Sequence, residues 1–381
     1  MYKDILTEIV DLLENKRDLL QNDYGLLSGL TGKAILINEY KKLYPESKIE
    51  IETYIEDVFN SIENYDSIST YCAGISGACL GIGYLNKSNF EGDGTFDFIS
   101  DEVEEFIDLS YVNYIKDDNI DFLHGSVGVA FYYLERLNED KDQEKYKNNI
   151  EILLSHLKET GIWNDNMLRW KESTNISLSH GMASIVILLC NLIRQDINFN
   201  TDISHILKEV VNYILSQEID YSQYGSFFPN KSNSYEIGKS RLAWCYGDLG
   251  IALCLLNASE VLNDDLIKKK ALQIINYASN RRDLEENFIV DASLCHGTSG
   301  IAMFFYSLFL KMKDDHYLNT AKYWLDKTIE LYREKKVFYL VNENRYDHER
   351  LSLLEGKIGI ALAILTIHFN VQSEWQKFLL I

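Results

Sequence analysis

The sequence has little proline and no hydrophobic run long enough to cross a membrane. Only Pro45 and Pro229 occur in 381 residues, and because proline disrupts helix interiors, this scarcity favours a mostly helical fold. The longest apolar run, around Ile185–Ile193, falls well short of the roughly 20 residues that span a bilayer. The start of the sequence carries Asp4 where a signal peptide needs a basic flank. We therefore expect a soluble protein in the cytoplasm.

Positive charge is also scarce. The chain has 37 Lys and Arg against 58 Asp and Glu, for a formal net charge of −21. Nucleic-acid binding depends on a basic face, so this balance argues against a nucleic-acid partner. It leaves room for a cationic peptide substrate, although solubility alone would explain it. A hydrophobic content of 46% excludes a disordered chain.

The six cysteines are expected to be thiols or ligands, because a chain without a secretion signal rarely forms disulfides. Three lie inside apolar helical runs and are predicted to be small core residues: Cys79, Cys190 and Cys254. Cys72 precedes a glycine turn, and core packing is the favoured interpretation for it too. Cys245 and Cys295 remain, and each also precedes a glycine turn.

A short glycine turn followed by an apolar run occurs seven times along the chain. Six copies have the pattern Gly-x-x-Gly, and they begin at Gly29, Gly74, Gly125, Gly247, Gly297 and Gly356. The seventh copy, Gly181–Ser184, has serine in place of the second glycine. The first glycines are 45 to 66 residues apart, which leaves room for two helices and their connections in each repeat.

Each turn is preceded by an amphipathic segment and followed by one that is apolar nearly all round. This alternation predicts seven outer helices around seven inner ones, from a first outer helix in Asp4–Leu20 to a last inner helix in Ile358–Ile367. A ring of helical hairpins would bury the face that each hairpin exposes alone. It would also place all seven turns at one end. No linker rich in glycine, serine or proline divides the chain, so residues 1–381 are predicted to form a single domain.

Four connections between an outer helix and the next turn are long and rich in aromatic residues. Some alternate well enough to contain short strands, and because they approach the same end as the turns, they are expected to form the rim of a pocket. These connections are Ile162–Ser179, Asp220–Ser240, Asn287–Leu294 and Val337–Leu353.

Two turns together carry a candidate metal site. Cys245 lies in Trp-Cys-Tyr-Gly, and Cys295 is followed directly by His296 in Leu-Cys-His-Gly. Three such ligands with no fourth attached match a catalytic zinc site, which keeps one coordination position open. A structural zinc site would more often contain Cys-x-x-Cys pairs. The alternative is two buried cysteines and a helix-capping histidine.

Titratable side chains gather on the third to sixth turns, which is the best internal argument for an active site. These residues are Asp121, His124, His180, Arg241, Cys245, Tyr246, Asp248, Cys295 and His296. Polar residues on turns often only cap helices, and for Asp248 capping is our prediction. For Asp121 or His180 taken alone, capping or a core hydrogen bond is an open alternative.

Trp-Cys-Tyr-Gly followed about fifty residues later by Cys-His-Gly, on a sevenfold glycine repeat, resembles the lanthionine synthetase C-like family. The resemblance covers essentially the whole chain. It implies an all-α fold, an α,α-toroid of two concentric seven-helix layers. The length is similar to that of a stand-alone lantibiotic cyclase, without the fused dehydratase of bifunctional members. A departure is Leu249, where the family often has proline. No stretch is large enough for the extra inserted domain of some members.

The resemblance implies one Zn²⁺ bound by Cys245, Cys295 and His296, with water or the substrate thiol in the fourth position. It also implies catalytic roles for His180, Asp121, Arg241 and Tyr246. The implied reaction adds peptide cysteine thiols to dehydroalanine or dehydrobutyrine in a dehydrated lanthipeptide precursor. Implied partners are a dehydratase and an export transporter, whose complex would place the protein at the membrane periphery.

Three alternatives to a lanthionine cyclase are open. A non-catalytic, zinc-containing member of the same fold would bind a peptide or glutathione, but it would not need His180, Asp121 and Arg241 together. A zinc prenyltransferase would also activate a cysteine thiol on a helical toroid, but it needs a basic pocket for a lipid diphosphate. A bare helical-repeat scaffold would not need two cysteines and a histidine on adjacent turns.

Overall fold

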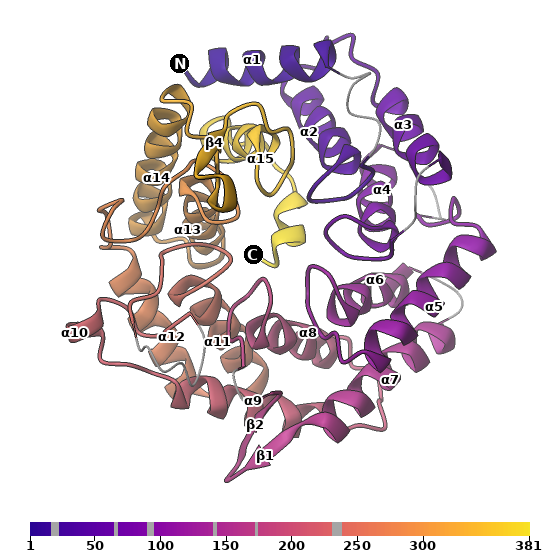
Figure 1. The fold of residues 1–381 in the computed structure, drawn as a ribbon, viewed down its shortest axis with the longest axis vertical. Coiled ribbons are helices and arrows are strands. Elements are labelled where there is room, and N and C mark those ends of the chain that lie inside the picture. Colours follow the sequence, from indigo (N-terminus) through magenta and orange to yellow (C-terminus); the bar gives the residue numbers. More distant parts are fainter. Residues whose placement is uncertain (17–22, 65–67, 90–94, 140–142, 172–173, 231–237) are drawn as a thin grey trace. The chain divides into compact units, whose positions relative to one another are not determined.

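The computed structural model describes residues 1–16, 23–64, 68–89, 95–139, 143–171, 174–230 and 238–381 (Figure 1). The chain divides into two compact units. The first contains Met1–Ile107 and Ile289–Ile381, and the second contains Asp108–Phe288. Helix α5 (Asp101–Lys116) runs from the first unit into the second. The expectation of a single domain remains a prediction, and each unit is described by itself.

The first unit contains the first two and last two repeats of the chain. Its outer helices are α1 (Tyr2–Asn15), α3 (Ile51–Asn64) and α14 (Asp315–Arg333), and its inner helices are α2 (Leu30–Leu43), α4 (Ile75–Asn89), α13 (Thr298–Met312) and α15 (Lys357–Ala363). The inner helices pack side by side in the order α13, α15, α2, α4. A π-helical turn, Ile364–His368, continues α15, and short 3₁₀ turns occupy Val341–Glu343 and Trp375–Leu379. The predicted first outer helix is confirmed as far as Asn15, and residues 17–20 lie outside the described part of the chain.

The first and last repeats meet within this unit. Helix α1 packs against α15, and the Tyr332 hydroxyl on α14 donates a hydrogen bond to Glu8 on α1, with 2.8 Å between the oxygens. Figure 1 shows the indigo N-terminal helix beside the yellow C-terminal elements. The two ends of the chain are therefore joined by packing in one unit.

The second unit follows the same alternation. Its inner helices are α6 (Ser126–Glu139), α8 (Met182–Arg194) and α11 (Asp248–Leu262), and its outer helices are α7 (Gln143–Thr160), α9 (Ile203–Ser216) and α12 (Asp265–Ala278), with one short helix, α10 (Tyr221–Tyr224). Inner helix α8 lies between α6 and α11, and each inner helix packs against the outer helix that follows it. The predicted alternation of outer and inner helices is thus confirmed within each unit.

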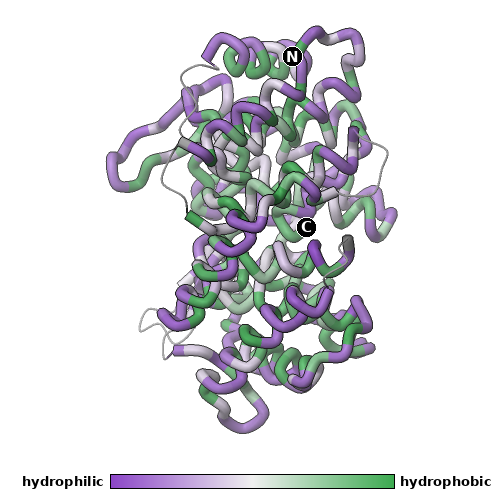
Figure 2. The backbone as a smooth tube through the Cα atoms, turned by 90° about the vertical axis from the view of Figure 1, so that its right-hand side faces the viewer, coloured by the Kyte–Doolittle hydropathy of each residue, from purple (hydrophilic) through white to green (hydrophobic). Residues whose placement is uncertain are grey.

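Burial explains why the two kinds of helix differ in sequence. On outer helix α1 one stripe is buried, made of Ile5, Leu6, Ile9, Val10 and Leu13. On inner helix α8, by contrast, every residue from Met182 to Cys190 is buried. Apolar positions at helical spacing therefore suffice for an outer helix, whereas an inner helix must be apolar on all sides. Figure 2 shows hydrophobic and hydrophilic residues alternating along the helices.

Two of the four long connections contain the predicted strands. In the second unit β1 (Ile162–Asn164) pairs antiparallel with β2 (Met167–Arg169), and Trp163 faces Leu168. In the first unit β3 (Phe338–Leu340) pairs antiparallel with β4 (Arg345–Asp347). Connection Asp220–Ser240 holds only α10 among its described residues, and Asn287–Leu294 holds no strand. No helix in the described part of the chain is long and apolar enough to span a membrane.

Glycine starts the inner helices because the turns are too crowded for a side chain. At Gly297 an added Cβ would lie 2.4 Å from both Asp291 Oδ1 and Ser293 N. Gly247 has a φ of 86°, and a Cβ there would lie 2.3 Å from the carbonyl oxygen of Arg241. A positive φ and such close approach together favour glycine strongly. The glycine pattern of the sequence thus marks where the chain passes from an outer to an inner helix.

Candidate active site and metal ligands

Turns of neighbouring repeats are connected by backbone hydrogen bonds at the residue two positions before the first glycine. In the first unit Cys295 N donates to Leu354 O, Leu354 N donates to Leu27 O, and Leu27 N donates to Cys72 O, each at 2.9 Å. In the second unit Ser179 N donates to Cys245 O at 3.3 Å. The prediction that the turns converge is therefore confirmed inside each unit.

Both predicted cysteine ligands occupy this bonded position. Cys245 comes just before α11, is only 3% exposed, and also accepts a hydrogen bond at its carbonyl from Ser179 Oγ at 3.2 Å. Cys295 comes just before α13 and is partly exposed. The backbone hydrogen bonds at this position use N–H and C=O groups rather than the thiols.

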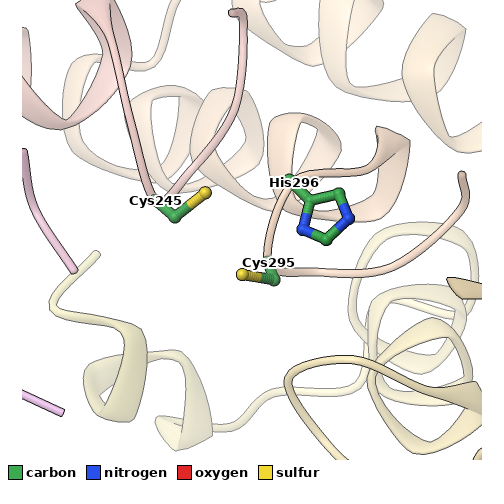
Figure 3. A group of neighbouring side chains, drawn as sticks. All are labelled: Cys245, Cys295 and His296. Carbon is green, nitrogen blue, oxygen red and sulfur yellow. The ribbon is translucent and has the colours of Figure 1, made fainter. Parts of the chain in front are cut away.

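His296 is oriented by a buried carboxylate of its own turn. Its Nε2 lies 2.9 Å from Oδ2 of Asp291, a side chain with no exposed surface. In Figure 3 the His296 ring turns one nitrogen towards the side on which Cys295 lies and the other away from it. Asp291 was not predicted from the sequence as a site residue.

Cys295 and His296 of the first unit and Cys245 of the second are side chains of the kinds that can hold a metal ion (Figure 3). Two thiolates and one imidazole form a donor set that zinc prefers, and three protein ligands leave one position open. The residues present therefore fit the predicted zinc. They do not fit the alternative of a capping histidine, because the N-cap of α13 is Gly297 and no side chain caps that helix.

Asp121 and His180 form a short pair in the second unit. His180 Nδ1 and Asp121 Oδ2 are 2.7 Å apart, while Asp121 Oδ1 accepts a hydrogen bond from the backbone N–H of His124 at 2.8 Å. One carboxylate thus connects the third turn to the fourth. Burial lowers the pKa of His180, but the hydrogen bond and charge of Asp121, with a smaller contribution from Cys245, raise it above the usual value overall.

Tyr246 and His124 lie around His180. The ring centroid of Tyr246 is 6.1 Å from that of His180, and the Tyr246 hydroxyl accepts a hydrogen bond from Asn175 Nδ2 at 3.4 Å. The His124 ring also stacks on that of His180, with 5.9 Å between centroids. Asp121, His124, His180 and Tyr246, which come from the third, fourth and fifth turns, are therefore neighbours in this unit.

His180 and Asp121 line a cavity of about 220 Å³ within the second unit. The connection between β2 and α8 forms part of its wall through Trp170, Lys171 and Asn175. This bears out, for Ile162–Ser179, the prediction that the long connections form the rim of a pocket; residues 172 and 173 lie outside the described part of the chain. Because 32% of the His180 side chain is exposed, a substrate can reach it.

Arg241 differs from the other predicted residues because the structure records no hydrogen bond or ion pair between its guanidinium and another described residue. Its backbone lies against Gly247, at the start of α11. The side chain is partly exposed. Nothing in the described residues therefore ties its charge to a structural partner such as Asp121.

The prediction that Asp248 caps a helix is wrong. The N-cap of α11 is Gly247, with no side-chain cap. The Asp248 carboxylate instead accepts hydrogen bonds from Phe227 N at 3.0 Å and Phe228 N at 3.1 Å, and it pairs with Arg281 Nη1 at 3.0 Å. Asp248 is fully buried, and its carboxylate bonds to the connection that precedes α11 and to Arg281. It therefore holds that connection against α11 instead of accepting from the free N–H groups at the start of the helix.

Comparison with known proteins identifies the family. Residues 21–380 match the family described as Lanthionine synthetase C-like protein. The chain belongs to this family. The nisin biosynthesis protein NisC of Lactococcus lactis subsp. lactis is 24% identical over 403 residues, which cover 97% of this chain and 91% of that protein. A solved structure of nisin cyclase superposes with a TM-score of 0.74 at 20% identity, covering 99% of this chain and 96% of that one.

The likeness to nisin cyclase confirms the predicted fold class, an all-α α,α-toroid. At 20% identity it concerns the fold alone. Membership of the lanthionine synthetase C-like family agrees with the resemblance noted from Trp-Cys-Tyr-Gly and Cys-His-Gly. The roles of individual residues in this family member rest on the geometry above and on the proposals below.

Proposed function

We propose that this member of the lanthionine synthetase C-like family is a lanthionine cyclase. It would add peptide cysteine thiols to dehydroalanine or dehydrobutyrine in a lanthipeptide precursor and so form (methyl)lanthionine thioether rings. The observation that carries the proposal is the His180–Asp121 pair, 2.7 Å apart, on the wall of a cavity. The names of its relatives, a nisin biosynthesis protein and nisin cyclase, support it.

Cys245, Cys295 and His296 would bind one zinc ion in this proposal. A free thiol has a pKa of about 8.5 and is therefore mostly protonated at pH 7, whereas zinc lowers the pKa of a bound thiol enough to yield the thiolate. With Cys245 and Cys295 as thiolate ligands, a bound zinc would be electron-rich and would leave the substrate sulfur reactive. The predicted count of three protein ligands matches this use, because it leaves one position for the substrate.

The addition is balanced without any oxidant. One carbon–sulfur bond forms at the β-carbon of the dehydro residue, its carbon–carbon double bond becomes single, and the thiol proton ends on the α-carbon. A base and an acid are therefore sufficient. His180 is proposed to move this proton with its Nε2, because its Nδ1 is occupied by Asp121. Asp121 would fix the ring and favour its protonated form.

Arg241 and Tyr246 are proposed to act on the carbonyl of the dehydro residue. As the thiolate adds, negative charge develops on that oxygen, and donors placed around it lower the barrier. Arg241 is suited to this role because its guanidinium has no recorded partner among the described residues. Tyr246 lies beside His180 and carries a hydroxyl that could donate to the same oxygen.

We further propose that residues 1–381 act as one domain in the cytoplasm or at the membrane periphery. The partners would be the dehydrated precursor peptide and, in a biosynthetic complex, a dehydratase and an export transporter. The net charge of −21 is compatible with a cationic peptide and argues against a nucleic-acid partner.

A synthetic peptide with one cysteine and one dehydroalanine tests the proposal. Cyclisation leaves the mass unchanged but removes the free thiol, so the product should resist alkylation by N-ethylmaleimide. We expect zinc-loaded protein to protect the peptide from alkylation, and the His180→Asn variant to do so far more slowly. A protein that binds the peptide tightly while the thiol remains alkylatable would be a non-catalytic binding member, and the proposal would fail.

A further inference from the structure

We propose that Asp291 is a positioning residue that fixes the ring of His296 so that Nδ1 is the nitrogen presented to the metal. This inference deepens the proposed zinc site and rests on it. Asp291, His296 and the residues that contact them, Ser293, Phe338 and Tyr339, all lie in the first unit. Asp291 does not touch the metal or the substrate in this proposal, because it acts through the histidine.

The two oxygens of Asp291 have separate tasks. Oδ1 accepts hydrogen bonds from Ser293 N at 3.0 Å and Ser293 Oγ at 2.8 Å, which closes the local turn. Oδ2 accepts from the backbone N–H of Tyr339 at 2.9 Å and lies 2.9 Å from His296 Nε2. A carboxylate that accepts at Nε2 requires a proton there, so Nδ1 keeps its lone pair for a metal.

The equivalent turns of other repeats show that closing the turn is a shared role of this position, whereas contacting a histidine side chain is particular to Asp291 in the described part of the chain. The residue six positions before the first glycine is also Asp or Asn at Asp23, Asn119 and Asn175. Oδ1 of Asp23 accepts from Gly25 N, and Oδ1 of Asn175 accepts from Ser177 N, each at 2.9 Å. The turn therefore needs only one acceptor oxygen, which asparagine also supplies. Only in the sixth turn, among the described residues, does a second oxygen meet a histidine of the same turn.

Strand β3 provides two further contacts to the Asp291–His296 pair. Tyr339 fixes the carboxylate through its backbone N–H, and the neighbouring Phe338 packs its ring against His296, with 5.1 Å between centroids. Phe338 is 7% exposed, so it forms a buried wall for the imidazole. The ring is thus constrained by a hydrogen bond at one edge and by an aromatic contact at its side.

The test compares Asp291→Asn with the matched variant Asp23→Asn. Asparagine retains the turn-closing oxygen at both positions, but at position 291 its amide group cannot accept from Nε2–H. Loss of such an outer partner typically weakens metal binding by about 10–100-fold. We expect this loss of zinc affinity for Asp291→Asn, measured by competition with a chromogenic chelator, and unchanged affinity for Asp23→Asn. The unfolding midpoint of zinc-free Asp23→Asn should stay close to that of zinc-free wild-type protein. The midpoint of zinc-free Asp291→Asn should be lower, because Tyr339 N–H also loses its acceptor, so zinc affinity is compared only under conditions in which both variants are folded.

Zinc affinity equal to wild type in Asp291→Asn would overturn the inference, and so would equal losses in the two variants. Wild-type protein that binds no zinc would instead defeat the proposed metal site. A measurement on unmodified protein covers the case in which Asp291→Asn does not fold. In a long-range ¹H–¹⁵N spectrum of histidine-labelled protein, the histidine that changes on zinc removal should carry its proton on Nε2. A proton on Nδ1 would refute the inference.

Discussion

Ser179 donates two hydrogen bonds to the carbonyl oxygen of Cys245, one from its backbone N–H at 3.3 Å and one from its hydroxyl at 3.2 Å. Ser179 directly precedes His180 in the sequence. The turn with the proposed acid–base residue is therefore connected to the turn with a proposed zinc ligand through Ser179 and the backbone of Cys245, without the side chains of His180 or Cys245. Each of the two functional side chains can be replaced without removing this connection, so variants at either position are interpretable.

Removing a ligand should remove the metal and leave the helices. We expect about one zinc per wild-type chain and none in Cys245→Ala or Cys295→Ala, because two remaining ligands bind zinc weakly. The apolar core holds the fold, so far-ultraviolet circular dichroism should change little. Elemental analysis of the purified variants gives the zinc content. Unfolding of the wild-type protein by a chelator would mean that the metal is structural.

His180→Asn should separate catalysis from metal binding. The variant should keep its zinc, yet form rings about 10²–10⁴-fold more slowly, which is the usual contribution of proton transfer by a positioned side chain. Single-turnover loss of the free peptide thiol measures the rate. A variant with wild-type zinc and a wild-type rate would leave His180 only a structural role.

The His180–Asp121 pair should make stability depend on pH. Asp121 raises the pKa of His180 in the folded protein above the unfolded value of about 6.5. A raised pKa means that the folded state binds the proton more tightly, so the stabilisation is fully present below the unfolded pKa and is lost as pH rises through the folded pKa. In zinc-free protein, the thermal midpoint of wild type should exceed that of Asp121→Asn most near pH 6 and least at high pH. A gap that widens with rising pH would contradict this.

The buried Arg281 should matter far more to stability than an exposed arginine with a similar partner. Arg281 and Asp248 are 6% and 0% exposed, and their atoms lie 3.0 Å apart. Arg281→Ala leaves the carboxylate without its cation, which typically costs about 3–5 kcal/mol. The control is Arg194→Ala, whose Glu260 partner lies at 3.1 Å with both side chains more than a third exposed, and which should cost about 0–1 kcal/mol. Urea unfolding measures both, and equal losses would disprove the prediction.

Arg241→Lys distinguishes a catalytic arginine from a structural one. If Arg241 stabilises charge on the substrate carbonyl, lysine should slow ring formation although the positive charge is kept, because a planar guanidinium and an ammonium present their donors differently. Single-turnover cyclisation should therefore fall while the thermal midpoint stays constant. A normal rate with a lowered midpoint would assign Arg241 to the scaffold.

The repeat pattern predicted much of the fold because helix burial follows directly from helix periodicity. Outer helix α9 illustrates this, because Ile203, Ile206 and Val210 stand at helical spacing in the sequence and the structure buries all three. The role of Asp248 was not predictable in this way. Its partners Phe227 and Arg281 are 21 and 33 residues away in the sequence, and no local pattern reports a carboxylate that bonds to a distant loop.

The candidate metal ligands Cys245, Cys295 and His296 could be singled out from the sequence because cysteine and histidine have few other reasons to occur on adjacent turns. The carboxylate behind His296 was missed, since an aspartate in a turn is ordinarily explained by the turn itself. A signal was nevertheless present in the sequence: Asp291 occupies the same repeat position as Asp23, Asn119 and Asn175. Its own turn is the one among these four that carries the Cys-His pair.

The backbone hydrogen bonds between successive turns make the side chains on those turns exchangeable. Leu354 and Leu27 occupy the same bonded position as Cys295 and, like it, donate a hydrogen bond from the backbone N–H, yet they carry apolar side chains. The same hydrogen-bonded backbone position therefore carries an apolar side chain in some turns and a potentially reactive one in others. A designer could accordingly move a ligand pair from one repeat to the next, by placing cysteine and histidine at Leu354 and Glu355, without inventing a new loop.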